Sequence, residues 1–390
     1  MHDHASAPDR RPEPLQAFTP RQVSAAIGLG VISLMMSGLM PIFVGALASE
    51  HRLSAAGIGR VATLELLCTA LTTGIAGAAL KLRRLKVVGV LAALALAGAN
   101  LVTVGAAGVP LMAARALAGV PEGLLLWMVI GLIARSPTPE RRAGLLFTAM
   151  AASQLLVAVI LALAVLPRFG VDGGYLFIAG LSLLGMPIAL LLPSAHGPLP
   201  EGTEGGMPPP RGWIALFAVF VFQASVAGAS VYIVPLALQA GFSPRVAHTA
   251  IAMALALEVA GGAFATAISG RANFLDVLLV SALVMLGAFG VYVARPADWA
   301  FVTASAAIGF CALLIMPFIV PMTIKADPSR RTAVQIGGAQ LMGGAVGPVL
   351  SSMVVTARNA HGAVYLSAAL LVTSLCAIYG LNRQTRSNEI

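Results

Sequence analysis

Runs of about 20 apolar residues recur from one end of this 390-residue chain to the other. A helix of that length crosses the hydrocarbon core of a bilayer with all of its backbone polar groups hydrogen-bonded internally. The chain is 58% hydrophobic and only 10% charged, whereas soluble domains carry about 25% charged residues. The sequence therefore predicts an all-α membrane protein and excludes a water-soluble enzyme.

Charged or Pro/Gly-rich breaks divide the apolar sequence into twelve predicted transmembrane helices. These cover residues 22–47, 55–80, 87–107, 109–134, 144–166, 174–192, 213–240, 246–270, 274–294, 298–324, 332–357 and 360–381. The one long internal linker, 193–212, follows the sixth span. We therefore expect two six-helix bundles, 22–192 and 213–381. The polar ends, 1–21 and 382–390, are expected to be tails, the first of them disordered.

The distribution of Lys and Arg predicts the orientation. With the N-terminus inside, 17 of the 24 basic residues fall in cytoplasmic segments and 5 in outer loops, as the positive-inside rule requires. Both termini and the linker are then cytoplasmic, and we expect a multi-pass protein of a bacterial-type inner membrane. The net charge of +9 reflects this orientation and contact with anionic lipid headgroups, so nucleic-acid binding is not expected.

The two predicted halves resemble each other in sequence. The segment TPERRA at 138–143 recurs as DPSRRTA at 327–333, each between the fourth and fifth spans of its half. Glu65 in the second span and Glu258 in the eighth occupy equivalent positions of the two halves. Internal duplication of this kind is typical of secondary transporters, whose binding site lies between the repeats near the bilayer midplane.

These features together resemble the major facilitator superfamily over nearly the whole chain. The six-plus-six layout, Arg115-x-x-x-Gly119 in span 4, the PERRAG turn at 139–144 and its repeat at 327–333 carry the resemblance. It implies a twelve-span transporter whose cavity is lined by spans 1, 4, 7 and 10. The loop at 77–86 departs from the family pattern, because Lys81 stands where an aspartate is usual. Span 5 also lacks the Gly-Pro-rich motif of drug/proton antiporters.

Within the predicted spans, three glutamates and one arginine are the candidate functional charges. Glu65, Glu122 and Glu258 fall near mid-bilayer, and Arg115 lies two turns before Glu122 on the same helix stripe. A charge at the centre of a membrane helix costs about 2.5–3.5 kcal/mol on insertion scales, so such residues pair, line water or carry function. We predict that Glu122, Glu65 and Glu258 couple transport to protons. Arg115 is placed to hold Glu122 ionised, or to bind an anionic substrate when Glu122 is protonated. The structural alternatives are a buried Arg115–Glu122 pair and interhelical hydrogen bonds.

Uncharged polar residues at depth are candidate substrate contacts. Together with Arg115 we single out Gln223, Tyr232, Gln154 and Gln340. The alternative is that these side chains hold helices together through hydrogen bonds.

Candidate hinges and gates follow from prolines and from the basic loop. Pro41, Pro235 and Pro317 interrupt helix hydrogen bonds in spans 1, 7 and 10, which must bend in alternating access. Arg83 and Arg84 are the candidate gating residues after span 2. A static kink is the alternative for the prolines.

The sequence predicts a proton-coupled secondary transporter of a small organic solute, an organic anion or an amphipathic metabolite, working as a monomer. No metal-binding, hydrolase or nucleotide-binding motif occurs, so neither a metal nor a cofactor besides the coupling proton is expected. Three alternatives stay open: an uncoupled facilitator, a proton-driven efflux pump for drugs or metabolites, and a transporter-like receptor.

Overall fold

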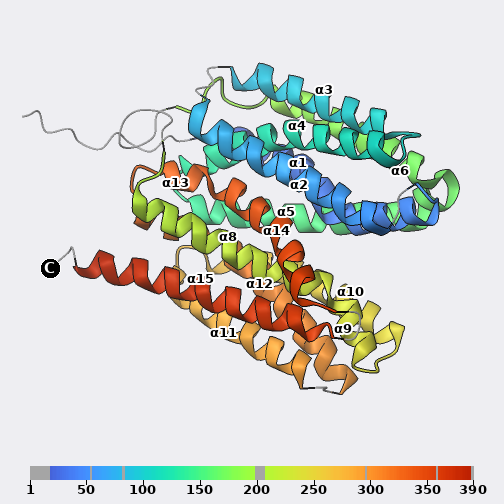
Figure 1. Cartoon of the computed structure of the whole chain (residues 1–390). Coiled ribbons are helices and arrows are strands. Elements are labelled where there is room, and N and C mark those ends of the chain that lie inside the picture. Colours follow the sequence, from blue (N-terminus) through green and yellow to red (C-terminus); the bar gives the residue numbers. More distant parts are fainter. Residues whose placement is uncertain are drawn as a thin grey trace, which may run out of the picture.

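The computed structural model describes residues 18–52, 55–80, 84–197, 207–294, 297–356 and 359–387 (Figure 1). These residues form helices joined by short connections, and the β-type pairing among them is one isolated bridge between Thr356 and Asn359. Residues 1–17 of the expected tail, the candidate gate Arg83 and linker residues 198–206 lie outside the described residues. The fold class is all-α, as the sequence predicts.

The first half packs around α4. Helices α2 and α3 lie against α4, α1 packs on α4 and α5, and α3 also contacts α6. The elements are α1 (Pro20–Ser49), α2 (Ala55–Ala79), α3 (Leu85–Thr103), α4 (Gly108–Ala134), α5 (Pro139–Ile160), the π-helix η1 (Leu161–Val165), α6 (Leu166–Leu183) and α7 (Gly185–Ala189).

The second half repeats this arrangement around α12. Helices α10 and α11 pack on α12, and α8 lies between α14 and α15. The elements are α8 (Pro210–Val231), α9 (Ile233–Gln239), α10 (Pro244–Ile268), α11 (Phe274–Val293), α12 (Asp298–Ala326), α13 (Arg331–Val334), α14 (Ile336–Val354) and α15 (His361–Ser387).

The helices match the predicted spans closely, with shifted ends. Among the described residues, nine helical segments are long and apolar enough to cross a membrane, and one of these, residues 139–189, runs for 51 residues. That length suffices for two crossings of about 20 residues. Its helical course is interrupted at Gly170, where φ is 61°, a conformation that glycine adopts without steric cost. The number of twelve crossings stays a prediction.

The tail boundaries differ from the predicted ones. Helix α1 begins at Pro20, two residues before the predicted start, and α15 continues to Ser387, past the predicted end at 381. At the first of these ends, proline suits an opening helical turn because its missing N–H has no partner there.

The two halves lie side by side, the blue-to-green half beside the yellow-to-red half (Figure 1). They meet where α2 packs on α14 and where α5 packs on α10 and α12. We call the end of the bundle that holds residues 190–197, 135–138 and 327–330 the linker end. There Arg330 of the second half donates from Nη1 to the carbonyl oxygens of Ala134 (2.6 Å) and Ser136 (3.2 Å) in the first half.

The residues after α7 form a strap, residues 190–197, that packs back on the first half. The backbone N–H of Leu85 donates to Ser194 O (3.0 Å), and Arg135 Nε donates to Gly197 O (3.0 Å). His196 contacts Met128 O through Nε2 (2.9 Å) and lies edge-on to Trp127. The segment predicted as the linker, 193–212, has other ends in the structure, because 193–197 packs on the first half and α8 begins at Pro210.

Candidate functional site

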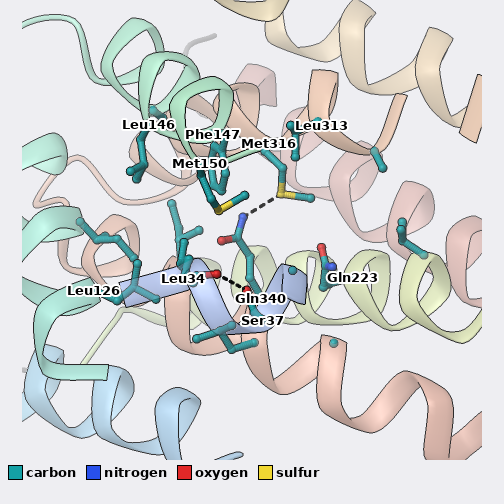
Figure 2. A pocket seen from close by; sticks show the side chains of 18 of the residues that line it. Leu34, Ser37, Leu126, Leu146, Phe147, Met150, Gln223, Leu313, Met316 and Gln340 are labelled. Atoms are coloured by element: carbon teal, nitrogen blue, oxygen red, sulfur yellow. Dashed lines mark hydrogen bonds between the residues drawn. The ribbon is translucent and has the colours of Figure 1, made fainter. Parts of the chain in front are cut away.

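A cavity of about 340 Å³ lies between the two halves. Helices α1, α2, α4 and α5 of the first half and α8, α10, α12 and α14 of the second contribute to its wall (Figure 2). The wall is largely apolar, and its polar side chains are Ser37, Gln154, Gln223, Glu258 and Gln340. A concave, mostly apolar site with a few convergent polar groups is the usual form of a small-molecule site. We call it the central cavity.

Three of the four glutamine and tyrosine candidates line the central cavity. Gln154 Nε2 donates to Leu34 O (2.7 Å), and Gln340 Nε2 contacts the sulfur of Met316 (3.0 Å), an interaction drawn across the cavity in Figure 2. Gln223 makes no hydrogen bond with the described residues. Amide groups of all three thus reach one space, although they come from α5, α8 and α14. Their role as substrate contacts stays a prediction.

Glu258 is the one ionisable side chain among the residues that line the central cavity. It is half-buried on α10 and forms neither a hydrogen bond nor an ion pair with the described residues. A carboxylate without a protein partner in a membrane-embedded cavity needs a proton, water or a ligand to offset its charge. Glu258 is therefore the group of the cavity wall that can bind a proton or a cation.

Arg115 lies in a separate buried cluster within the first half. Its Nε donates to Glu65 Oε2 (2.9 Å), and its Nη2 forms a second, short bond to Glu65 Oε1. Its Nη1 donates to Asn100 Oδ1 (2.7 Å), and the guanidinium lies 5.4 Å from the centre of the Tyr175 ring. The side chain has no exposed surface. We call Arg115, Glu65, Asn100, Tyr175 and Glu122 the charge cluster.

Glu122 occupies the edge of the charge cluster. Its Oε1 lies 3.9 Å from Arg115 Nη2, and its Oε2 accepts a hydrogen bond from Thr69 Oγ1 (3.1 Å). The expected Arg115–Glu122 pair is therefore not the main contact, because the two-pronged bond of the guanidinium goes to Glu65. The common stripe of Arg115 and Glu122 does exist, and it faces α2 rather than the central cavity.

A narrow space lies between the charge cluster and the central cavity and shares lining residues with both. It holds about 10 Å³ and is lined by Ser37, Glu65, Thr69 and Glu122, among others. Ser37 also lines the central cavity, and nearby Ser33 donates from Oγ to the Glu122 carbonyl oxygen (2.7 Å). Hydroxyl groups thus lie between the two carboxylates of the cluster and the cavity.

Other candidates lie away from these sites. Tyr232 stands at the break between α8 and α9, outside the cavity lining. The break falls at the turn before Pro235, whose ring clashes with the carbonyl four residues earlier. Helix α12 continues through Pro317, α1 continues through Pro41, and Arg84 is exposed before α3. Their hinge and gate roles stay predictions.

The structure adds side chains that are not among the candidate site residues given above. Tyr175 and Asn100 complete the surroundings of Arg115, and Phe147 and Met150 line the central cavity. Asn100 is visible in the sequence as a polar residue at depth. The position of Tyr175 depends on how α6 is rotated against α4, which a single sequence does not reveal.

Comparison with known proteins agrees with this architecture. The sequence model described as Major Facilitator Superfamily matches residues 25–337. The chain belongs to this superfamily. Among curated proteins, none matches it by sequence.

Several solved transporters of the superfamily have a similar fold. The human organic anion transporter MFSD10 (TETRAN) aligns with a TM-score of 0.70 at 16% identity, over 93% of this chain and 100% of that one. The E. coli fucose:proton symporter FucP gives 0.70 at 12% identity, over 92% and 98%. The proton:xylose symporter XylE gives 0.66 at 11% identity, over 92% and 94%. At these identities the likeness shows the fold alone. The superfamily match, together with the nine long apolar helical segments among the described residues, makes the chain a multi-pass membrane protein.

Proposed function

We propose that this superfamily member is a proton-coupled secondary transporter that moves a small amphipathic organic solute by alternating access. The observation that carries the proposal is the unpartnered carboxyl group of Glu258 on the wall of a cavity between the two halves. Binding sites between repeats near the midplane are the rule in secondary transporters. A single carboxyl group there is suited to exchange a proton with the solution or with a solute.

The charge cluster supplies a second place for a proton. The charged and titratable side chains around Glu122 are Arg115 on its own helix, Glu65 on α2 and Tyr175 on α6. Glu65 already neutralises Arg115, so an ionised Glu122 would leave one uncompensated negative charge in the membrane, which is costly. We therefore assign the coupling protons to Glu258 and Glu122, with Glu65 holding Arg115 in place.

The solute class follows from the charges of the cavity wall. No cationic side chain occurs among its lining residues, and Arg115 is fully buried with its donors engaged. This favours a neutral or cationic amphipathic solute over the organic anion that Arg115 suggested from the sequence. The apolar wall suits the hydrophobic part of the solute, and the three amides suit its polar groups.

An uncoupled facilitator is the second candidate. In that case Glu258 binds a cationic solute directly and carries no proton. In either case we propose a monomer in a bacterial-type inner membrane with the linker end facing the cytoplasm, where the positive-inside rule places it. An efflux pump would use the same groups in the reverse direction.

The test begins with a thermal-shift screen of metabolites and lipophilic cations at two pH values. A solute at 100 times its Kd stabilises the folded protein by about 2.7 kcal/mol. Hits then enter proteoliposomes with the pH dye pyranine trapped inside. We expect solute and protons to move together, and we expect Glu258→Gln to retain solute binding while losing proton movement. Asp298→Asn, an exposed carboxylate at the start of α12, is the matched control. Solute flux without a pyranine signal in the wild type would establish the uncoupled facilitator instead.

A further inference from the structure

A second cavity of about 440 Å³ lies entirely within the first half. It is bounded by α1, α3, α4, α5, α6 and α7 and shares no lining residue with the central cavity. Leu156 and Leu184, which line it, are 62% and 55% exposed on the outside of the bundle. It therefore faces the hydrocarbon of the bilayer, and we call it the lateral cavity.

The two ends of the lateral cavity differ in chemistry. Apolar side chains such as Met35, Met36 and Ile178 form most of the wall, whereas the deep end holds Asn100, Ser182 and Glu122. Asn100 already donates a hydrogen bond to Ser182 Oγ and accepts one from Arg115 Nη1. Glu122 Oε2 accepts from Thr69 Oγ1 (3.1 Å), Glu122 Oε1 lies 3.9 Å from Arg115 Nη2, and the Glu122 carboxyl group also lies within hydrogen-bond reach of the Glu65 carboxyl group. The deep end thus offers a hydrogen-bond acceptor.

The charge of this deep end selects the head group of a ligand. Among the described residues the charge cluster holds two carboxyl groups and one guanidinium. A cation brought by the ligand completes the balance, whereas an anion would add to the excess. An ammonium group also supplies hydrogen-bond donors to the two neighbouring carboxyl groups.

The depth of Glu122 decides between a free amphiphile and a phospholipid. Glu122 lies 14 residues after Gly108 and 12 before Ala134, hence about 21 Å and about 18 Å from the two ends of α4 at 1.5 Å per residue. The ammonium group of a phospholipid stays in the headgroup layer, outside a hydrocarbon core about 30 Å thick. A single-chain amine can enter the hydrocarbon core as the neutral free base and become the ammonium there by accepting the proton of the Glu122 carboxyl group, which leaves an ammonium–carboxylate pair.

We propose that the lateral cavity is a second binding site, which takes membrane-dissolved aliphatic amines with the ammonium group on Glu122 and the chain along α1 and α5. This site is distinct from the central cavity and shares with the proposed function only the carboxyl group of Glu122, so photolabelling tests it without a transport assay. Its volume lies within the 300–1,000 Å³ typical of small-molecule sites.

Photolabelling tests the proposal directly. The probe is a dodecylamine that carries a diazirine on its chain, applied to the full-length protein in lipid nanodiscs, with labelled peptides mapped by mass spectrometry. We expect labels on α1 and on the α5–α6 segment, displaced by dodecylamine at about tenfold lower concentration than by 1-dodecanol. Labels on the central-cavity helices α8 and α12, or labels spread over the whole lipid-facing surface, would overturn the proposal.

Matched variants locate the site. Ser153 and Ala149 line the lateral cavity, whereas their neighbour Ala152 is exposed and lines neither cavity. We expect Ser153→Phe and Ala149→Phe to remove the labelling of α1, and Ala152→Phe to leave it unchanged. Glu122→Gln should keep the labelling but abolish the preference for the amine over the alcohol. Equal labelling of Ser153→Phe, Ala149→Phe and Ala152→Phe, each confirmed monodisperse, would contradict the site.

Discussion

Arg115 has no exposed surface and lies between two carboxyl groups, one bonded in two places and one 3.9 Å away. A buried charge that loses its partner costs about 3–5 kcal/mol, although the pair itself contributes little net stability. Glu122 is near enough to pair with Arg115 if Glu65 is removed, and we call it the reserve partner of Arg115 for this reason. Stability should therefore respond to the two glutamates together and not to each alone.

We predict that Glu65→Gln and Glu122→Gln are each tolerated, and that the double variant loses about 3–5 kcal/mol of unfolding free energy. The free energy of unfolding is measured by detergent unfolding of the wild type, the two single variants and the double variant, which together form a double-mutant cycle. Glu140→Gln, on a glutamate in the first turn of α5, is the control. A double variant that equals the sum of two small single effects would show that Glu122 is not the reserve partner of Arg115.

His196 in the strap gives a pH-dependent contribution to stability. Burial lowers the pKa of His196 to about 3 from its ordinary value of 6.5, and the Arg135 guanidinium acts in the same direction. The folded protein therefore holds the neutral ring, whereas the unfolded chain takes up a proton below pH 6.5. Its contribution is fully present above pH 6.5 and is lost as the pH falls toward 3.

We predict that the free energy of unfolding falls by about 1.4 kcal/mol per pH unit below 6.5 on account of His196. In His196→Gln the amide can still donate to Met128 O but does not titrate, so this part of the slope should vanish. Denaturation between pH 5 and 7 compares the two proteins. Parallel pH profiles would mean that His196 has the same pKa in the folded and the unfolded protein.

At the scale of helices, Gly119 determines how closely α2 and α4 approach. A Cβ at Gly119 would lie 2.5 Å from the Glu65 carbonyl oxygen, well inside van der Waals contact. Small residues allow such backbone contacts between membrane helices. The Arg115-x-x-x-Gly119 pattern thus has a physical basis, because the glycine lets α2 come near enough for Glu65 to reach Arg115.

We expect Gly119→Val to separate α2 from α4, to break the Glu65–Arg115 bonds and to lower the thermal unfolding midpoint by several degrees. Gly98→Val, at a glycine of α3 whose Cβ would meet no atom within 4 Å, controls for the glycine-to-valine change itself. Equal midpoints for the two variants would show that α2 and α4 adjust without strain.

The sequence predicted the helices well because apolar length and charge breaks are local signals. It also singled out Arg115, the three glutamates and the glutamines as candidates, since polar residues at membrane depth are rare, and their functional roles stay predictions. The partner of Arg115 was not predictable, because it depends on the rotation of α2 against α4. The cavity lining was only partly predictable: Gln154, Gln223 and Gln340 come together through packing between halves, which a single sequence leaves undetermined.

The duplicated loops show the same limit. Thr138 and Asp327 occupy equivalent positions at an offset of 189, yet only Asp327 organises its loop among the described contacts. Its carboxylate accepts hydrogen bonds from Thr332 N (2.9 Å) and Ser329 N (3.1 Å). This ordered loop holds Arg330 toward the end of α4, whereas its counterpart Arg141 is exposed.

At the scale of the whole molecule, Arg330 fastens the two halves at the linker end. Its guanidinium binds the carbonyl oxygens of Ala134, the last residue of α4, and of Ser136 just after it, at the helix end that favours a positive charge. Hydrogen bonds to a charged group contribute about 1.5–3 kcal/mol. Opening this end, as alternating access requires, must break these bonds.

We predict that Arg330→Gly shifts the protein toward a state that is open at the linker end, by a factor of about 10 or more. Glycine suits this test because Arg330 has φ 61°, so the backbone conformation is kept while the side chain is lost. Distances between spin labels on Pro137→Cys and Ser329→Cys, in a background without native cysteines, report the opening. Arg141→Gly is the symmetry-related control, and an equal effect of both variants would argue against a specific fastening.

The strap also affects how the chain could be divided. Its contacts, from Ser194 to Leu85, from His196 to Met128 and from Gly197 to Arg135, all fall within the first half. Only 12 residues, 198–209, separate the strap from α8, a reach of at most about 43 Å. A nick within that stretch leaves every described strap contact on the N-terminal fragment. If the two halves are produced in one cell as separate polypeptides divided within 198–209, we therefore expect them to associate into a working transporter. The N-terminal fragment can form all of its strap contacts before the second fragment binds.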